Sequence, residues 1–319
     1  MPEQGKKEID KKGKFIRQDN QFVTPFGEKE GELPIEANRY RILWAPVCPW
    51  AHRSIIVRSV LGLEDVISVG KADPLRPTDV DRVDWAFTLD EGDLDPVLKI
   101  KYISEVYKNA DPNYQGRPTV PAVVDLTTKK VVNNDYHELT YYWETAWKKF
   151  HKEGAPDLFP KELQEDIRAL STIIFHDINN GVYKAGFAHS QEAYELAYDA
   201  VFARFDELEK RLEGQRYLFG NKITDADVRL YVTLARFDVA YNTAFRLNRN
   251  RLVEFPNLWA YARDLYQTPG FGDTTDFEAI KKHYHLSILI DPNSKRPQIL
   301  PKGPDVSGWN TPHNREKLL

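Results

Sequence analysis

The chain has 319 residues, 41% hydrophobic and 12% aromatic, which is enough for about two domains with buried cores. Its net charge of -4 argues against nucleic acid or an anionic membrane surface as the main partner, and no apolar run approaches the ~20 residues of a membrane span. The single cysteine, Cys48, excludes an internal disulfide and a cysteine-rich metal site, and it favours a reducing, cytoplasmic setting. The charged first residues lack the apolar region of a secretory signal.

The chain opens with a polar arm. Residues 1–39 show no periodicity, so we expect an extended segment there. Residues 39–45 then favour a strand, and from Pro49 apolar residues recur at helical spacing up to Gly62. Residues 65–70 favour a second strand. A strand, a helix and a strand in this order predict a crossover unit with a parallel pair.

The next elements complete a domain. A long Pro- and Asp-rich connection contains one helical piece at residues 102–110. Residues 119–125 and 131–134 flank a polar loop and predict a β-hairpin, and residues 135–150 predict a helix. Because βαβ followed by ββα is the order of a thioredoxin-like domain, we assign that fold to residues 40–150.

After a linker the pattern becomes helical throughout. Thr224 is predicted to be a helix N-cap, with Asp227 three residues on as in a capping box. We assign residues 151–290 to an all-helical domain and the Pro-rich residues 291–319 to an extended tail. Two helical faces are marked by apolar residues, namely Leu163, Ile167, Leu170, Ile174 and Ile178 on one, and Ala197, Val201, Phe205, Leu208 and Leu212 on the other.

Cys48 stands between the first strand and the helix that Pro49 begins, which places it at the N-cap. There the sulfur faces backbone N–H groups and the positive end of the helix dipole, and both favour the thiolate. Cysteines in such positions have pKa values lowered from about 8.5 into a range of about 3.5–7.5, and His52 and Arg53 add positive potential. The alternative is a small buried core residue. The position favours a reactive thiol, and since no second cysteine exists to resolve a mixed disulfide, an external thiol must do so.

Pro121, in "TVPAV", suits the proline that thioredoxin-like domains place opposite the active residue, commonly after a cis bond. The backbone of Val120 would then pair with a bound peptide thiol. The alternative is an edge-strand proline without a ligand role.

Several long motifs carry a family resemblance. They are "CPWAHR", "NADPNYQGRPTVPAVVD", "NNGVYKAGFA", "LFGNKITDADVRLYVTLARFDVAYN", "FPNLWAYARDLYQTPGF" and "KKHY". From about residue 40 to 305 the chain resembles the glutathionyl-hydroquinone reductases, the Xi class of glutathione transferases. The resemblance implies a thioredoxin-like domain followed by an all-helical one, and a homodimer.

The resemblance also implies a reaction. The family's catalytic thiol maps onto Cys48, which would attack the sulfur of a glutathionyl-hydroquinone, release the hydroquinone and keep glutathione as a mixed disulfide. A second glutathione would then free the enzyme. Open alternatives are general thiol transfer (deglutathionylation or dehydroascorbate reduction) and, from another class, a non-catalytic ligand-binding or assembly protein on the same scaffold.

Further site residues follow from the resemblance alone. Tyr183, Tyr241 and Tyr284 match tyrosines that serve the phenolic substrate, and Trp85 matches an aromatic residue over the bound tripeptide. Arg117, near the "TVP" strand, is a further thiol-site candidate. Without the resemblance each tyrosine would be interpreted as packing, since the chain has 16 of them.

The chain departs from the family where the γ-glutamyl end of glutathione is held. Asp135 and Tyr136 stand in place of Glu and Ser. The Asp135 carboxylate can still pair with an α-ammonium group, whereas the bulky Tyr136 is expected to alter the pocket. A second hypothesis is therefore that the cosubstrate is a low-molecular-weight thiol other than glutathione. His285 stands where the family tends to have a tyrosine. His52, His137 and His285 show no metal-ligand spacing, so no metal is expected.

Overall fold

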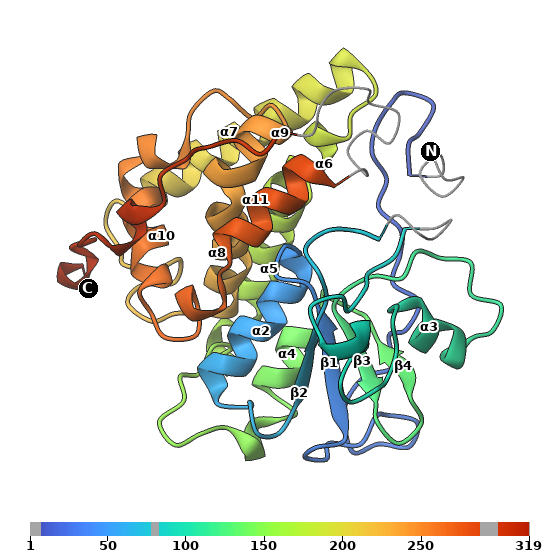
Figure 1. The fold of residues 1–319 in the computed structure, drawn as a ribbon. Coiled ribbons are helices and arrows are strands. Elements are labelled where there is room, and N and C mark those ends of the chain that lie inside the picture. Colours follow the sequence, from blue (N-terminus) through green and yellow to red (C-terminus); the bar gives the residue numbers. More distant parts are fainter. Residues whose placement is uncertain (1–7, 78–82, 288–298, 319) are drawn as a thin grey trace. The chain divides into compact units, whose positions relative to one another are not determined.

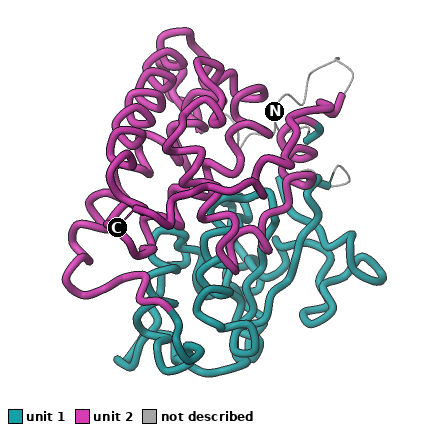
Figure 2. The backbone as a smooth tube through the Cα atoms, turned by 90° about the vertical axis from the view of Figure 1, so that its left-hand side faces the viewer, with its two compact units in different colours: residues 1–6, 18–155, 286–295 teal, residues 7–17, 156–285, 296–319 magenta. Residues whose placement is uncertain are grey.

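The computed structural model describes residues 8–77, 83–287 and 299–318 and divides the chain into two compact units (Figures 1 and 2). Of these residues, the first unit contains 18–155 and 286–287, and the second contains 8–17, 156–285 and 299–318. The division at residues 155/156 falls in the predicted linker, "HKEGAPDLFP" at residues 151–160. Within the described residues, no helix combines the length and apolar character needed to cross a membrane.

The first unit is built on a four-stranded sheet with the order β2-β1-β3-β4. The strands are β1 (Tyr40–Trp44), β2 (Ser68–Lys71), β3 (Ala122–Asp125) and β4 (Lys130–Asn133). The predicted crossover is confirmed, because β1 and β2 are parallel, with Ile42 opposite Val69. The predicted hairpin is confirmed as well, since β3 is antiparallel to both β1 and β4. This is the sheet of a thioredoxin-like domain.

Among the described residues of this unit, three helices cover the sheet. Helix α2 (Pro49–Leu61) begins and ends as predicted, with Gly62 in the left-handed conformation (φ 74°) at its C-cap. Helices α2 and α4 (Leu139–Glu144) pack side by side on one face, and α3 (Ser104–Ala110) lies on the other (Figure 1). The prediction of a helix over residues 135–150 was wrong in extent. The Asp135 side chain accepts the His137 N–H and forms a turn, so α4 begins only at Leu139. At the other end, the Thr145 hydroxyl donates to the Tyr141 carbonyl at 2.6 Å, and α4 ends at Glu144.

The second unit is all-helical, as predicted. Both predicted faces are largely buried, although Leu163 and Leu170 are only half-buried. The elements are α5 (Gln164–Ile174), a π-helical turn (Phe175–Asn179), α6 (Gly181–Gly186), α7 (Gln191–Arg211), α8 (Asp225–Arg236), a second π-helical turn (Phe237–Tyr241), α9 (Asn242–Ala244), α10 (Pro256–Tyr266) and α11 (Phe277–Leu286).

The predicted capping box at the start of α8 is confirmed. The fully buried Asp227 carboxylate accepts hydrogen bonds from the Thr224 N–H at 2.7 Å and the Thr224 hydroxyl at 2.8 Å. It also accepts from the Leu218 N–H at 2.9 Å and the Tyr261 hydroxyl at 2.7 Å. One side chain therefore joins the helix start, the preceding loop and α10.

The N-terminal arm is shared by the two units. Residues 8–17 belong to the helical unit, where the Gly13 carbonyl accepts from the His189 N–H at 2.9 Å and Phe15 packs on Phe187. From residue 18 the arm belongs to the first unit and runs along the edge of β4, with Val23 bridged to Asn133. Each part of the arm is thus held by its own unit.

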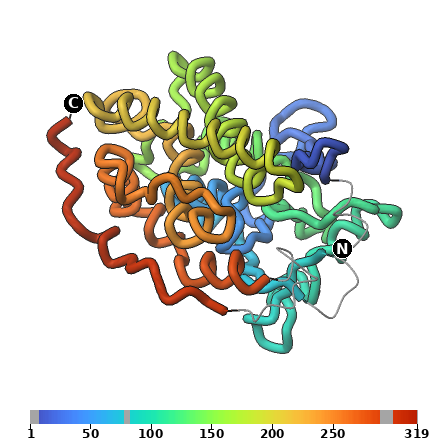
Figure 3. Tube along the Cα trace, turned by 90° about the horizontal axis from the view of Figure 1, so that it is seen from above, coloured from blue at the N-terminus to red at the C-terminus, as the bar shows by residue number. Residues whose placement is uncertain are grey.

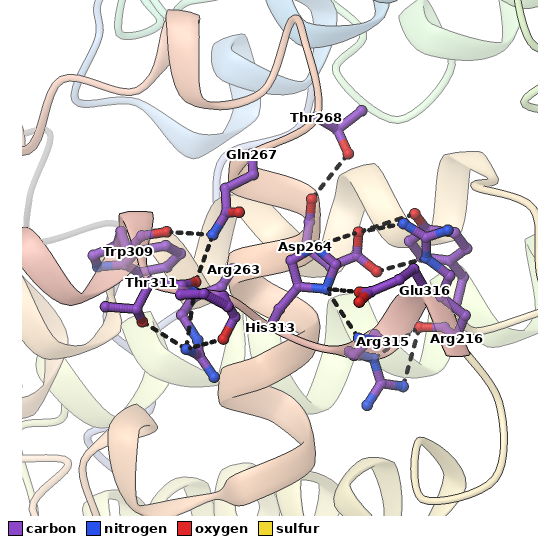
Figure 4. Close-up of polar contacts among 12 residues, drawn as sticks. Arg216, Arg263, Asp264, Gln267, Thr268, Trp309, Thr311, His313, Arg315 and Glu316 are labelled. Atoms are coloured by element: carbon purple, nitrogen blue, oxygen red, sulfur yellow. Dashed lines mark hydrogen bonds and ion pairs between the residues drawn. The ribbon is translucent and has the colours of Figure 1, made fainter. Parts of the chain in front are cut away.

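The C-terminal segment is held along α10. Part of the predicted tail, residues 291–298, lies outside the described residues. Residues 299–318 follow the outside of the helical unit (Figure 3), where Trp309 packs on Trp259 with ring centroids 4.9 Å apart. Arg263 and Gln267 donate to the Thr311 region (Figure 4). The Pro-rich composition predicted an extended path but not these contacts.

Candidate active site

Cys48 lies at the N-cap of α2, where the sequence places it. Its backbone is extended (φ -81°, ψ 115°), and Pro49 occupies the first helical position. The Cys48 N–H donates to the Ala45 carbonyl at 2.9 Å, and the Cys48 carbonyl accepts the His52 N–H at 3.0 Å. The strand end, the turn and the first helical turn therefore fix the half-buried thiol in one place.

The thiol points to the carbonyl of the cis Val120–Pro121 peptide, just before β3. The Sγ atom lies 3.3 Å from the Val120 carbonyl oxygen, with the thiol donating. In the part of the chain that the structure describes, the side chain makes no capping hydrogen bond to the first turn of α2. The carbonyl stabilises the thiol, whereas the helix dipole stabilises the thiolate. Cys48, Val120 and Pro121 are thus brought together.

Asp135 and Tyr136 stand in a turn after β4. The Asp135 Oδ1 atom accepts the His137 N–H at 3.0 Å and the Asn20 side-chain amide at 3.1 Å. Burial raises the pKa of Asp135 above its ordinary value, and these hydrogen bonds oppose the rise. Tyr136 is 7% exposed and packs on Trp50 with ring centroids 5.0 Å apart. Its ring belongs to an aromatic cluster beside the first turn of α2.

Trp85 and Arg117 have partners that the sequence did not reveal. The Arg76 guanidinium lies 3.3 Å from the Trp85 ring centroid, so a positive charge covers one face of this buried ring. The Arg117 N–H donates to the Gln18 side-chain oxygen at 2.8 Å, and the Arg117 carbonyl accepts the Tyr114 hydroxyl at 3.0 Å. Their roles at a thiol site stay predictions.

The three tyrosines meet in the helical unit. Tyr183 lies in α6, Tyr241 ends the second π-helical turn, and Tyr284 lies in α11. The hydroxyl oxygens of Tyr183 and Tyr284 are 2.5 Å apart, and each lies 3.3 Å from that of Tyr241. All three residues are at least nine-tenths buried. Three residues spaced over a hundred positions thus form one cluster of hydroxyl groups, which we call the tyrosine cluster.

The surroundings of the tyrosine cluster are aromatic and cationic. The Phe245 ring stacks on Tyr241 with centroids 5.3 Å apart and meets the other two tyrosines edge-on. Burial raises the pKa values of Tyr241 and Tyr284 well above the ordinary value, and the neighbouring phenols add to the rise. Arg17 from the arm lies 4.8 Å from the Tyr183 ring centroid. The Tyr241 and Tyr284 hydroxyls therefore keep their protons at neutral pH and are able to donate hydrogen bonds.

His285 follows the tyrosine cluster but bonds elsewhere. Its Nε2 atom lies 3.3 Å from the Thr243 hydroxyl, and burial lowers its pKa. Among the described residues, no group of three or more His, Cys, Asp or Glu side chains is arranged to hold a metal ion. Sequence reasoning missed Arg17, Gln18, Asn20 and Arg76, because a polar arm and a Pro-rich connection have no periodicity that would mark inward-facing positions.

Comparisons with known proteins agree with the fold and the motifs. A model of the glutathione S-transferase C-terminal domain matches residues 191–264. Glutathionyl-hydroquinone reductase YqjG of Escherichia coli (strain K12) is 40% identical over 312 residues, covering 95% of this chain and 93% of that protein.

Two solved structures are similar over nearly the whole chain. The glutathione-bound structure of YqjG from E. coli K-12 aligns with a TM-score of 0.83 and 37% identity over 93% of this chain and 96% of that one. The glutathione-S-transferase Xi from Phanerochaete chrysosporium aligns with a TM-score of 0.86 and 36% identity over 94% and 95%. The chain therefore belongs to the glutathionyl-hydroquinone reductase family, the Xi class of glutathione transferases.

Proposed function

We propose that this protein uses glutathione to reduce glutathionyl-hydroquinones to hydroquinones through a mixed disulfide on Cys48. The observation that carries the proposal is the placement of Cys48, at the start of α2 and 3.3 Å from the Val120 carbonyl, in a chain of this family. This chain's only cysteine thus stands where thioredoxin-like folds place a nucleophile.

In the first half-reaction the Cys48 thiolate attacks the sulfur of the thioether. A sulfur–sulfur bond forms, the sulfur–carbon bond breaks, and its electron pair stays on the aromatic carbon, which takes a proton. The carbon is thereby reduced and the two sulfurs are oxidised to a disulfide. The helix dipole at Cys48 favours the thiolate that this attack requires.

In the second half-reaction a second glutathione thiolate attacks the sulfur of the bound glutathione. Glutathione disulfide leaves and the Cys48 thiolate is restored. We assign Trp85, Arg117, Val120, Pro121, Asp135 and Tyr136 to binding of the thiol. The Asp135 carboxylate would pair with the α-ammonium group of the γ-glutamyl end.

The tyrosine cluster serves the phenolic substrate in this proposal. The buried Tyr241 and Tyr284 hydroxyls keep their protons at neutral pH, which suits them to donate hydrogen bonds to phenolic oxygens. One hydroxyl of the cluster formed by Tyr183, Tyr241 and Tyr284 would give a proton to the departing carbon.

The reaction is tested by measuring its stoichiometry. We expect one hydroquinone and one glutathione disulfide for each glutathionyl-hydroquinone consumed, and neither product from Cys48→Ser. A glutathionylated peptide and dehydroascorbate serve as competing substrates. Turnover of these two without hydroquinone formation would replace the proposed reaction by general thiol transfer.

We further propose that the protein acts in the cytoplasm as a homodimer. A reducing compartment suits a catalytic thiol that has no resolving cysteine in its own chain. Light scattering after size-exclusion chromatography should give twice the mass of one chain, and a monomer mass would contradict the dimer.

A further inference from the structure

The arm runs past the proposed thiol site as an extended chain. Along residues 18–23 burial alternates, since Gln18, Asn20 and Phe22 are half-buried whereas the residues between them are exposed. A period of two is that of a strand whose one face lies against the protein. The inward side chains come from alternate positions of one extended segment.

Gln18 binds the backbone of Arg117 from both sides. Its side-chain oxygen accepts the Arg117 N–H at 2.8 Å, and its amide donates to the Arg117 carbonyl at 3.3 Å. The same carbonyl accepts the Tyr114 hydroxyl at 3.0 Å. Gln18 therefore fixes the backbone three residues before Val120, whose carbonyl faces Cys48.

Asn20 binds the side chain of Asp135. The Asn20 amide donates to the Asp135 Oδ1 atom at 3.1 Å, and the His137 N–H donates to the same oxygen at 3.0 Å. Both donors meet Oδ1, and a backbone hydrogen bond from Glu138 also lowers the pKa of this carboxyl, so Asn20 is the one side chain from the described residues of the arm among the groups that set the rotation of the carboxylate. A carboxylate held in this way is oriented for a cation.

The next residues anchor the arm. The Phe22 N–H donates to the Asn134 side-chain oxygen at 3.1 Å, and the Phe22 carbonyl accepts the Asn134 N–H at 2.8 Å. The Asn133 side-chain amide donates to the Thr24 carbonyl at 2.8 Å. These contacts do not involve Asn20, so the arm stays in place when the Asn20 side chain is changed.

We propose that Asn20 is a positioning residue for the thiol cosubstrate, orienting the Asp135 carboxylate toward the α-ammonium group of its γ-glutamyl end, with Gln18 supporting the neighbouring strand entry. This inference rests on the proposed function, which assigns Asp135 to the thiol. The arm is then part of the thiol site, and it acts through Asp135 rather than by contact with the reacting sulfur.

The test measures glutathione binding to the free thiol site, because in the mixed disulfide the bound glutathione already occupies that site. Isothermal titration calorimetry in a Cys48→Ala background, repeated across a range of pH, gives an apparent dissociation constant for the thiol. The variants are Asn20→Ala, which removes the donor, and Asn20→Asp, which keeps the shape but sets a second carboxylate against Asp135. Gln21→Ala, on the exposed face of the same segment, is the matched control.

We expect Asn20→Ala to weaken glutathione binding by about five- to tenfold, the effect of one hydrogen bond to a partly exposed charged group. Asn20→Asp should weaken it more, because like charges repel. The acid limb of the binding profile should move to higher pH in both variants. Gln21→Ala should behave as the wild type, and the melting temperatures of all three should stay within about 2 °C.

Three results would overturn the inference. They are unchanged binding in Asn20→Ala, an equal loss in Gln21→Ala, and a milder effect of Asn20→Asp than of Asn20→Ala, which would mean that Asn20 only fills space. Asp135→Asn separates this failure from a failure of the proposed thiol site. If Asp135→Asn weakens binding and Asn20→Ala does not, only the role of Asn20 is wrong; if Asp135→Asn has no effect, the assignment of Asp135 to the thiol is wrong.

Discussion

The tyrosine cluster is not symmetric, and this makes single substitutions informative. Tyr183 and Tyr284 share the 2.5 Å contact, whereas Tyr241 reaches each of them only at 3.3 Å. Tyr284→Phe removes the short contact and one long one. Tyr241→Phe removes two long contacts and leaves the short one in place. We therefore expect the two variants to differ in hydroquinone release.

The size of the difference follows from the two kinds of loss. A positioned proton donor contributes typically about 10²–10⁴-fold to a rate, so Tyr284→Phe should slow hydroquinone release by about 10²-fold or more. A weak hydrogen bond contributes about 1 kcal/mol, so Tyr241→Phe should slow release by only about fivefold.

The assay is a single turnover with enzyme in excess, quenched rapidly, with the hydroquinone measured by chromatography. Tyr231→Phe is the control, because Tyr231 is buried in α8 of the same unit and bonds to the Thr275 hydroxyl at 2.8 Å. Equal losses in Tyr241→Phe and Tyr284→Phe would refute the reasoning from distance. Unchanged rates in both would remove the tyrosine cluster from the reaction.

Three further predictions concern stability. In Asp227→Asn an amide NH₂ group replaces one carboxylate oxygen and faces the two buried donors from which that oxygen accepted hydrogen bonds. The free energy of unfolding in urea should therefore fall by about 3 kcal/mol, and a loss below about 1 kcal/mol would contradict this. Arg315 donates to the Leu212 and Arg216 carbonyls at 2.9 and 3.1 Å. Arg315→Ala should therefore lower the free energy of unfolding by about 2 kcal/mol and speed proteolysis near the C-terminus. Unchanged proteolysis would mean that the segment is held without Arg315. The pKa of Asp125 is lowered, because hydrogen bonds from Thr127 and Arg39 outweigh the opposing effect of burial. The free energy that this pairing contributes to folding is present above the unfolded pKa of about 3.9 and is lost as the pH falls through the folded value. The free energy of unfolding, measured between about pH 2 and about pH 5, should therefore fall less steeply with acid in Asp125→Asn than in the wild type, and an unchanged slope would contradict the pairing.

The sequence predicted the elements whose signals are local. Pro49 and Gly62 mark the ends of α2 because their backbone preferences are strong. The apolar face of α7, from Ala197 to Leu212, is buried as the helical period requires. The Thr224–Asp227 capping box formed as predicted because its contacts lie within three residues.

Contacts between distant residues could not be predicted in this way. The hydrogen bond between Asn20 and Asp135 joins two positions 115 residues apart, and no pattern of apolar residues in the sequence predicts it. The π-helical turn that ends at Tyr241 breaks the regular helix period next to the tyrosine cluster. The resemblance placed Tyr183, Tyr241 and Tyr284 at one site, but their unequal spacing came only from the structure.

The most direct test of the account is the mass of the intact protein after incubation with a glutathionyl-hydroquinone and again after added glutathione. Because Cys48 is the single cysteine, a disulfide-bound adduct has no other place to form. We predict a gain of one glutathionyl group together with hydroquinone release, loss of the adduct on the second addition, and no adduct on Cys48→Ala. Hydroquinone release by Cys48→Ala, or turnover by the wild type without an adduct under trapping conditions, would contradict the central role of Cys48.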